Sequence, residues 1–258
     1  MSEKNRDGKR SARERLAVER EKQKAGEKRR RALIVGASVV CVLGLAAVIG
    51  VVAANSGKDK KSGASGPVVS PSGATGKDSL AIPVGKDSAK STLTVWEDFR
   101  CPACQAFETA YRPTIHELVD SGQLKVEYHL VTLIDGNLGG SGSLKAANAA
   151  ACAQDAGKFR DYHDVLYANQ PKETDDAFAD NAKLIELAGK VDGLDTPAFR
   201  SCVNGGTHDT WVEKSNAAFQ SNGFTGTPTV LLGGKNIYTD QSMTPAKLKQ
   251  MVEAANKG

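Results

Sequence analysis

The stretch "FRCPACQAF", residues 99–107, places Cys101 and Cys104 three positions apart, with a proline directly after the first cysteine. The preceding residues, "STLTVWEDF" (91–99), are rich in β-branched and aromatic side chains and predict a strand. Apolar residues at helical spacing follow the cysteines and predict a helix. The cysteine pair therefore lies where a strand passes into a helix.

The predicted helix extends to about Gly122, which supplies a stop signal. Pro113 lies within it, and we expect this proline to kink or break the helix. Residues 123–133, "QLKVEYHLVTL", alternate apolar and polar side chains and predict a second strand. A helical crossover between two strands favours a parallel pair. The next segment, "DGNLGGSGS" (135–143), is predicted to be a flexible loop.

A helical block is predicted over about residues 144–222, where Ala-rich segments with helical periodicity fit four or five short helices. Two strands of a hairpin follow, in "TPTVLLGG" and "KNIYTD", with the turn at Gly233 and Gly234. The last segment, "TPAKLKQMVEAANK", predicts a helix with Thr244 as its N-cap and Pro245 in its first turn. The predicted order is β, α, β, helical block, β, β, α.

Charge is distributed unevenly along the 258 residues. Residues 1–31 carry 13 Lys and Arg against 6 Asp and Glu, a balance of +7 within a chain whose net charge is +4. The remaining residues are therefore slightly acidic. A segment of mixed charges with few apolar residues is typical of a solvated tail, although anionic lipid or nucleic acid could also bind it. We predict a basic cytoplasmic tail and no nucleic-acid partner.

Residues 32–54 contain no charged side chain and would span about 35 Å as a helix, enough to cross a bilayer. The cluster "KRRR" (28–31) precedes this run, so the positive-inside rule predicts a cytoplasmic N-terminus. A cleaved signal peptide is the alternative, since "VAA" (52–54) loosely fits a cleavage site, but its apolar region is usually shorter. We predict a single-pass protein of the cell membrane with an extracytoplasmic domain.

Residues 55–79 are rich in Gly, Ser, Lys, Pro and Ala and predict a flexible linker, because such a segment buries little apolar surface. Residues 80–258 then form the folded part, which has the length of one ordinary domain. An α/β domain tethered to a membrane is the architecture that these segments predict.

The pair Cys101 and Cys104 has three possible roles: metal binding, stabilisation or redox chemistry. A zinc site needs four ligands, and neither the other cysteines nor the four histidines have ligand spacing. A disulfide across so short a loop stabilises little. At a helix N-terminus, by contrast, unpaired N–H groups and a positive partial charge stabilise the thiolate of the first cysteine. This favours a redox pair, and we predict neither a metal nor a cofactor.

The motif "DFRCPAC", a helical block and then "GFTGTPTVLLGG" (223–234) resemble the DsbA-like branch of the thioredoxin superfamily, which comprises membrane-anchored bacterial thiol-disulfide oxidoreductases. The resemblance covers Leu80 to about Lys257 and implies a thioredoxin-like α/β fold with an inserted helical subdomain. It also implies that the Thr227-Pro228 peptide is cis and packs against the cysteine pair. Without the resemblance, a trans proline opening an edge strand would be an equally good interpretation.

The resemblance bears on the other two cysteines as well. Some DsbA-like relatives carry a second bond, which implies a structural disulfide between Cys152 and Cys202 within the helical block. Two buried free thiols are one alternative. A relay that passes electrons to Cys101 is another.

Two departures from the family pattern concern possible helper residues. Many relatives place a buried acid six residues before the first cysteine, where this chain has Val95. Glu97 keeps the same strand parity and could face the same side, although it could equally be a carboxylate at a loop edge. The dipeptide between the cysteines, Pro102 and Ala103, contains no His to stabilise the thiolate. Arg100 could supply positive charge there instead.

These features predict an extracytoplasmic oxidase that introduces disulfides into exported cysteine-containing proteins through Cys101 and Cys104. The resemblance implies a membrane quinone-linked partner that reoxidises the pair. A disulfide reductase or isomerase is the alternative within the enzyme class. A non-catalytic, tethered peptide-binding module of thioredoxin fold is the alternative from another class, and intact cysteines argue against it.

Overall fold

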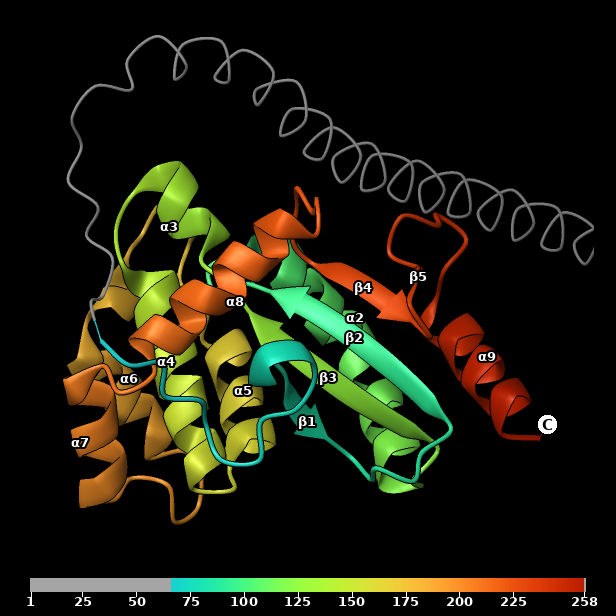
Figure 1. Ribbon diagram of the computed structural model, residues 1–258, viewed down its shortest axis with the longest axis horizontal. Helices are drawn as coiled ribbons and strands as arrows, with labels where there is room; N and C mark the ends of the chain where they lie inside the picture. Colours follow the sequence, from blue (N-terminus) through green and yellow to red (C-terminus); the bar gives the residue numbers. More distant parts are fainter. Residues whose placement is uncertain (1–65, 258) are drawn as a thin grey trace, which may run out of the picture. The chain divides into compact units, whose positions relative to one another are not determined.

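A five-stranded sheet lies at the centre of residues 66–257, the part of the chain that the computed structural model describes (Figure 1). The strand order is β1-β3-β2-β4-β5; β2 and β3 are parallel and the other neighbours are antiparallel. The strands are β1 (Ile82–Val84), β2 (Ser91–Glu97), β3 (Leu124–Leu130), β4 (Thr229–Leu232) and β5 (Lys235–Asn236). The parallel pair and the hairpin were both predicted from the sequence and are confirmed. Strand β1 was not predicted.

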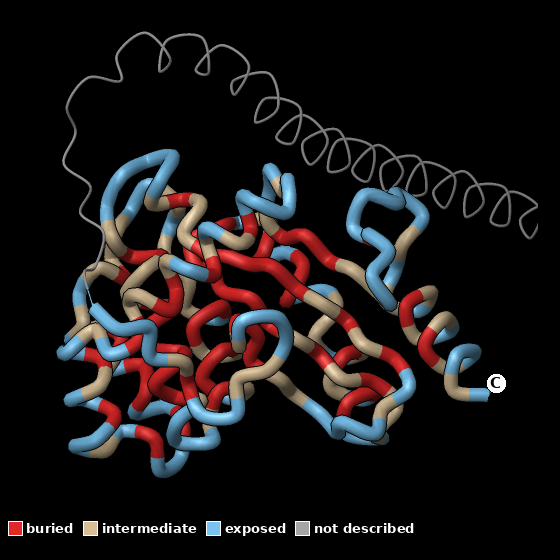
Figure 2. The backbone as a smooth tube through the Cα atoms, in the orientation of Figure 1, coloured by how far each residue is buried: buried red, intermediate tan, exposed pale blue. Residues whose placement is uncertain are grey.

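Different helices cover the two faces of the sheet. Side chains of β2 point alternately to one face and to the other. Trp96 packs on Phe219 of α8 (Asp209–Ser221), which lies in front of the sheet in Figure 1. Val95 belongs to the main core on the other face, where Glu97 contacts a residue of α5 (Phe159–Ala168). Figure 2 shows the central strands as largely buried.

Helix α2 (Pro102–Asp120) begins directly after β2 and the cysteine motif, as expected. Pro113 lies inside α2 and does not end it, so a break at this proline is contradicted, while the predicted kink stays a prediction. The buried side chains of Phe107, Ile115 and Leu118 flank the proline on both sides and hold the helix against the sheet. Tertiary packing therefore outweighs the missing backbone N–H.

The last helix, α9 (Pro245–Lys257), packs against α2. Its predicted N-cap is present, since the Thr244 hydroxyl oxygen accepts a hydrogen bond from the backbone N–H of Lys247 at 3.1 Å.

The inserted helical subdomain is built around α4, whose alanines are fully buried (Figure 2). The small side chains of these alanines let α5, α7 (Pro197–Gly205) and α8 pack closely against α4. Its helices are α3 (Leu133–Leu138), α4 (Gly142–Asp155), α5, α6 (Asn181–Ala188), α7 and α8, with the short 3₁₀ turn η2 (Ala177–Ala179) before α6. A second 3₁₀ turn, η1 (Lys77–Ser79), precedes β1 and lies outside the insertion.

Residues 135–143 were predicted to be a flexible loop, and this was wrong. The first part belongs to α3, and α4 begins at Gly142. The Asp135 carboxylate accepts hydrogen bonds from the backbone N–H groups of Ser143 and Leu144, both at 2.9 Å, and from Arg100 at 2.6 Å. A distant buried arginine thus orders a segment whose local composition favours a loop.

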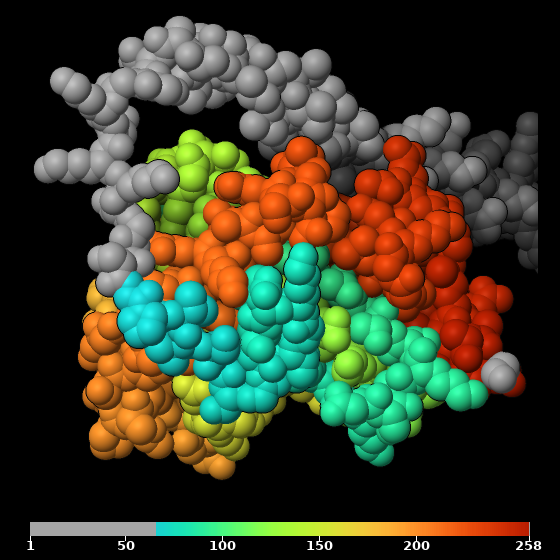
Figure 3. Space-filling view, in the orientation of Figure 1, coloured from blue at the N-terminus to red at the C-terminus, as the bar shows by residue number. Residues whose placement is uncertain are grey.

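The predicted linker was also wrong over residues 66–79, which lie against the helical subdomain (Figure 3). The carbonyl oxygens of Pro67, Val69 and Ser79 accept hydrogen bonds from Thr210, His208 and Trp211 respectively, at 2.9, 2.8 and 2.7 Å. These bonds use backbone groups, which every sequence has, so composition could not reveal them.

The predicted tail (1–31), membrane span (32–54) and remaining linker residues lie outside the described residues. Within residues 66–257, every helix is too short or too polar to cross a bilayer.

Candidate active site

The two cysteines lie at the start of α2. Cys101 is the N-cap residue, with extended backbone angles, and Pro102 occupies the first turn. Cys101 retains 6% of its exposure and Cys104 none, so only the first sulfur is within reach of a partner molecule. Pro102 is exposed and Ala103 is half-buried, which places the dipeptide at the surface beside Cys101. Both cysteines are free thiols in this structure, which therefore represents the reduced form.

The environment separates the two thiols in acidity. The pKa of Cys101 is lowered, first by a hydrogen bond with the Cys104 side chain and also by one with Thr227, against the opposing effect of burial. The pKa of Cys104 is raised well above the ordinary value, chiefly by burial and by its interaction with Cys101. One proton therefore resides on the inner sulfur, while the outer sulfur becomes a thiolate.

The second motif of the sequence, "GTPT" (226–229), faces the cysteine motif. The Thr227-Pro228 peptide is cis, and the Cys101 thiol donates a hydrogen bond to the Thr227 carbonyl oxygen at 3.3 Å. The Thr227 hydroxyl is buried and has no other hydrogen-bond partner within residues 66–257. It is therefore free to donate to the Cys101 sulfur once that sulfur is ionised.

Glu97 lies on the inner side of the pair and is fully buried. Its Oε1 atom accepts a hydrogen bond from Nε2 of His163 on α5 at 2.7 Å, and its charge helps to raise the pKa of Cys104. Glu97 thus points to the side of β2 that the alternation of side chains predicted. It is fully buried, so it is not a carboxylate at a loop edge in solvent. The sequence reasoning missed His163, because only the folded insertion brings α5 to this strand.

Comparison with known proteins agrees with this geometry. A thioredoxin family model matches residues 77–254, which include both motifs and the helical insertion. The chain belongs to the thioredoxin family. Within it, disulfide bond formation protein D of Bacillus subtilis is 27% identical over 180 residues, which span 68% of this chain and 77% of that protein.

Two solved structures from Mycobacterium tuberculosis are similar as well. The reduced disulfide bond oxidoreductase DsbG has 30% identity and a TM-score of 0.60 over 69% of this chain and 88% of that one. Reduced DsbA has 29% identity and the same TM-score, 0.60, over 69% of this chain and 93% of that one. This thioredoxin-family chain is therefore a DsbA-like thiol-disulfide oxidoreductase.

The helical insertion also forms hydrogen bonds with the residues around the cysteine motif. The Gln170 side chain donates hydrogen bonds to the carbonyl oxygens of Phe99 and Cys101, at 2.8 and 3.0 Å. The Gln105 side chain donates to the carbonyl oxygen of Tyr167 at 2.9 Å. These bonds fix the strand-to-helix turn that carries Cys101, and nothing in the local sequence of Gln170 could have indicated the contact.

Tyr238 is a further residue that the sequence reasoning missed. Its pKa is raised to about 12, first by burial and then by the charges of Cys104 and Cys101, so its phenol lies near the dithiol. Its ring contacts the edge of Phe107 on α2, with ring centroids 6.1 Å apart, although 42% of the residue stays exposed. Tyr238 thus borders the site from the segment after β5.

Arg100 has a different role from the one predicted for it. Its guanidinium pairs with Asp135 at 2.6 Å and with Asp176 at 2.9 Å, and only 2% of the side chain is exposed. The charged group that acts on Cys101 is instead Asp98, whose charge opposes ionisation of the thiol. Burial raises the pKa of Asp98 to about 6. Arg100 therefore anchors the insertion rather than stabilising the thiolate.

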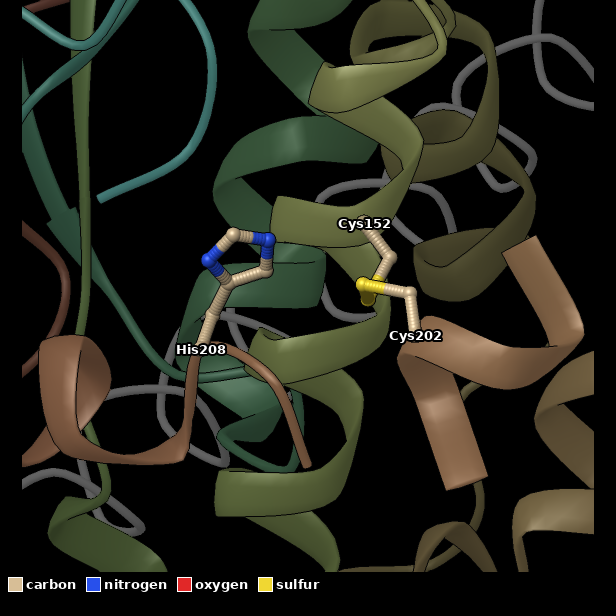
Figure 4. A group of neighbouring side chains, drawn as sticks. All are labelled: Cys152, Cys202 and His208. Carbon is tan, nitrogen blue, oxygen red and sulfur yellow. A yellow bond between two sulfur atoms is a disulfide. The ribbon is translucent and has the colours of Figure 1, made fainter. Parts of the chain in front are cut away.

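Cys152 on α4 and Cys202 on α7 form a disulfide, with Cα atoms 5.9 Å apart (Figure 4). His208 lies beside it, and the three side chains offer donor atoms close enough to share a metal ion. Both sulfurs are already bonded to each other, which removes them as thiolate ligands. Glu97, Glu108 and His163 form the other such group among the described residues. It is fully buried, and a hydrogen bond already joins two of its members.

Proposed function

We propose that this oxidoreductase acts as an oxidase, which introduces disulfides into exported proteins. A substrate thiolate attacks Cys101 Sγ in the Cys101–Cys104 disulfide, and the electron pair of the broken bond leaves on Cys104. A second substrate thiolate then attacks the substrate sulfur of the mixed disulfide and releases Cys101. The substrate is oxidised, and both cysteines of the enzyme end reduced.

The asymmetry between the two thiols is the observation that carries this proposal. The lowered pKa of Cys101 stabilises its thiolate and makes it a better leaving group, which favours the reduced form and makes the disulfide more oxidising. Burial of Cys104 directs every attack to Cys101. Thr227 and Pro228 lie beside Cys101, the less deeply buried cysteine of the pair, and are proposed to contact the incoming substrate chain.

The remaining parts of the proposal concern the cellular setting. The apolar segment 32–54 is proposed to anchor the chain, with residues 1–31 in the cytoplasm and the catalytic domain outside. The similarity to a disulfide bond formation protein supports substrates that are exported and contain cysteines. A membrane quinone-linked partner is proposed to reoxidise Cys101 and Cys104 after each turnover.

The test uses the full-length protein with a reduced peptide dithiol. We expect the oxidised protein to form the peptide disulfide and Cys101→Ala to be inactive. Cys104→Ala, mixed instead with the oxidised peptide, should form a mixed disulfide through Cys101, because its thiolate attacks the peptide disulfide and no second cysteine resolves the product. The double variant Cys152→Ala with Cys202→Ala is the matched control and should retain activity. Oxidation of the peptide by Cys101→Ala would refute the mechanism.

The direction of the reaction is tested by the reduction potential of the same protein in glutathione buffers. A potential of about −120 to −180 mV supports an oxidase, whereas about −270 mV is typical of a thioredoxin-like reductase. Absence of turnover in either direction would instead favour the peptide-binding alternative.

A further inference from the structure

The end of α5 and the loop after it, residues 167–173, lie along the cysteine motif on the side of the helical insertion. The Tyr167 hydroxyl donates a hydrogen bond to the carbonyl oxygen of Asp98 at 3.3 Å. Nη2 of Arg100 donates one to the carbonyl oxygen of Glu173 at 3.1 Å. Side-chain bonds in both directions therefore hold this segment against the motif.

Gln170 lies in the middle of the segment, and the fold uses only one end of its amide group. Nε2 donates to the carbonyl oxygens of Phe99 and Cys101, at 2.8 and 3.0 Å. Because both partners are acceptors, the nitrogen and not the oxygen faces them, and its two hydrogens are both used. Oε1 has no hydrogen-bond partner within residues 66–257, and the residue is only half-buried. The amide oxygen of Gln170 is thus left to accept a hydrogen bond from another molecule.

Cys101 joins Gln170 to the loop that carries the cis-proline. The carbonyl oxygen of Cys101 contacts Gln170 Nε2 at 3.0 Å, and its sulfur donates a hydrogen bond to the Thr227 carbonyl oxygen at 3.3 Å. Pro102, the next residue, is exposed. A peptide segment whose cysteine reaches the Cys101 sulfur therefore comes within reach of both Thr227 and Gln170.

An extended substrate chain has hydrogen-bonding groups along both of its edges, since the N–H groups of successive residues point alternately to opposite sides. Thr227 and Pro228 are proposed to contact the chain, which leaves the N–H groups of the opposite edge without a protein partner. We propose that Gln170 is a substrate-positioning residue, whose amide oxygen accepts a backbone N–H beside the substrate cysteine while its amide nitrogen holds Cys101. This inference rests on the proposed function, because it requires a substrate chain at Cys101.

The surface beside Cys101 suits a backbone group better than a charged side chain. Residues 102–106, at the start of α2, carry no charge, and Pro102 and Ala106 are exposed. A neutral amide oxygen is matched to a neutral N–H donor. Every residue except proline has this donor, whatever its side chain. The contact therefore serves exported proteins whose sequences differ around the cysteine.

The test is a double-mutant cycle on a mixed disulfide of full-length Cys104→Ala. In this variant a single-cysteine peptide displaces glutathione from the Cys101 sulfur, and the equilibrium constant of the exchange is read by mass spectrometry. Each peptide of a series carries one N-methyl group, on the backbone nitrogen of the cysteine or of one of its neighbours. We expect methylation at one position to lower the equilibrium constant by about 2- to 10-fold through loss of one neutral hydrogen bond to Gln170.

Variants of Gln170 assign that loss to its amide oxygen. In Gln170→Met the effect of methylation at this one position should disappear, whereas effects at the other positions should remain. Gln170→Lys keeps a donor for the two carbonyl oxygens but has no acceptor, and the effect should disappear in it as well. This second variant keeps the test decisive if Gln170→Met displaces the cysteine motif.

Gln154→Met is the matched control. Nε2 of Gln154 also donates to a backbone carbonyl oxygen, that of Ser72 at 2.9 Å, but Gln154 lies in the last turn of α4, away from the cysteine motif. The effect of peptide methylation should be the same in Gln154→Met as in the parent Cys104→Ala protein.

The outcomes separate this inference from the proposed function. Methylation effects that persist in both Gln170 variants would overturn it, as would their absence from the parent protein. Equal loss of the effects at all positions would also overturn it, because Gln170 would then act only by holding the motif. The oxidase function is tested separately, and a wild type that fails to oxidise a peptide dithiol would overturn that function whatever the cycle shows.

Discussion

Thr227→Val is the substitution that most directly tests how the fold lowers the pKa of Cys101. Valine keeps the shape of threonine and its backbone carbonyl but removes the hydroxyl, which is buried and has no other hydrogen-bond partner in the described part of the chain. A hydrogen bond to a charged group contributes about 1.5–3 kcal/mol. Sulfur is a weak acceptor, so we take the lower end, which corresponds to about one pKa unit.

The sign follows from which state the hydroxyl stabilises. It favours the thiolate of Cys101 and hence the reduced protein, so its loss raises the pKa of Cys101 and stabilises the disulfide relative to the dithiol. An effect of about 1.4 kcal/mol makes the reduction potential about 30 mV more negative for a two-electron couple. The variant should be a weaker oxidant, although Cys101 and Cys104 are both intact.

Two measurements on the full-length protein check this prediction. The pKa of Cys101 is obtained from the pH dependence of thiolate absorbance and of alkylation rate, and the potential from glutathione equilibration. Thr227→Ser retains the hydroxyl and is the matched control, with both quantities close to those of the wild type. Equal shifts in the Val and Ser variants, or no shift in the Val variant, would refute the role of the hydroxyl.

Three further predictions concern stability and its pH dependence. The Cys152–Cys202 disulfide joins residues 50 positions apart, and replacing both cysteines by alanine should lower the free energy of unfolding by about 2–4 kcal/mol. The pKa of Cys101 should not change, whereas a changed pKa would favour the alternative in which this disulfide passes electrons to Cys101. Arg100→Met leaves Asp135 and Asp176 without their buried partner and should cost about 3–5 kcal/mol, and a loss below 1 kcal/mol would contradict the anchoring role. Folding raises the pKa of Glu108 from 4.5 to about 8. Between these pH values Glu108 is protonated in the folded protein and ionised in the unfolded chain. The free energy of unfolding that this group contributes therefore falls as pH rises from 4.5 to about 8. Glu108→Gln should flatten the pH dependence of the melting temperature there, and an unchanged profile would exclude Glu108 as its source.

Much of the reaction centre could be predicted from the sequence. Cys101 and Cys104 lie three positions apart at a strand-to-helix junction, so their spacing and the local backbone are visible in a short stretch of sequence. The facing Thr227 is 126 residues away, and the resemblance to a known family supplied that contact rather than any local pattern. Strand parity was enough to place Glu97 on the correct side of β2, because alternation in a strand is a local property.

The partners of these residues were not predictable in the same way. His163 had no ligand-like spacing in the sequence, yet it forms a 2.7 Å hydrogen bond with Glu97 across a separation of 66 residues. Arg100 looked like a source of positive charge for Cys101, and the folded chain directs it to Asp135 instead. Residues 66–79 looked like a linker, and the folded insertion binds their backbone.

The sequence by itself determined the cysteine pair, its place at a helix N-terminus and the parallel central strands. These depend on the periodicity of side chains and on backbone preferences over a few neighbouring residues. Only the tertiary structure decided which buried charges meet. Burial makes an unpaired carboxylate or guanidinium costly, so each pairs with whatever group the packed helices bring within reach, and that group can lie anywhere in the chain.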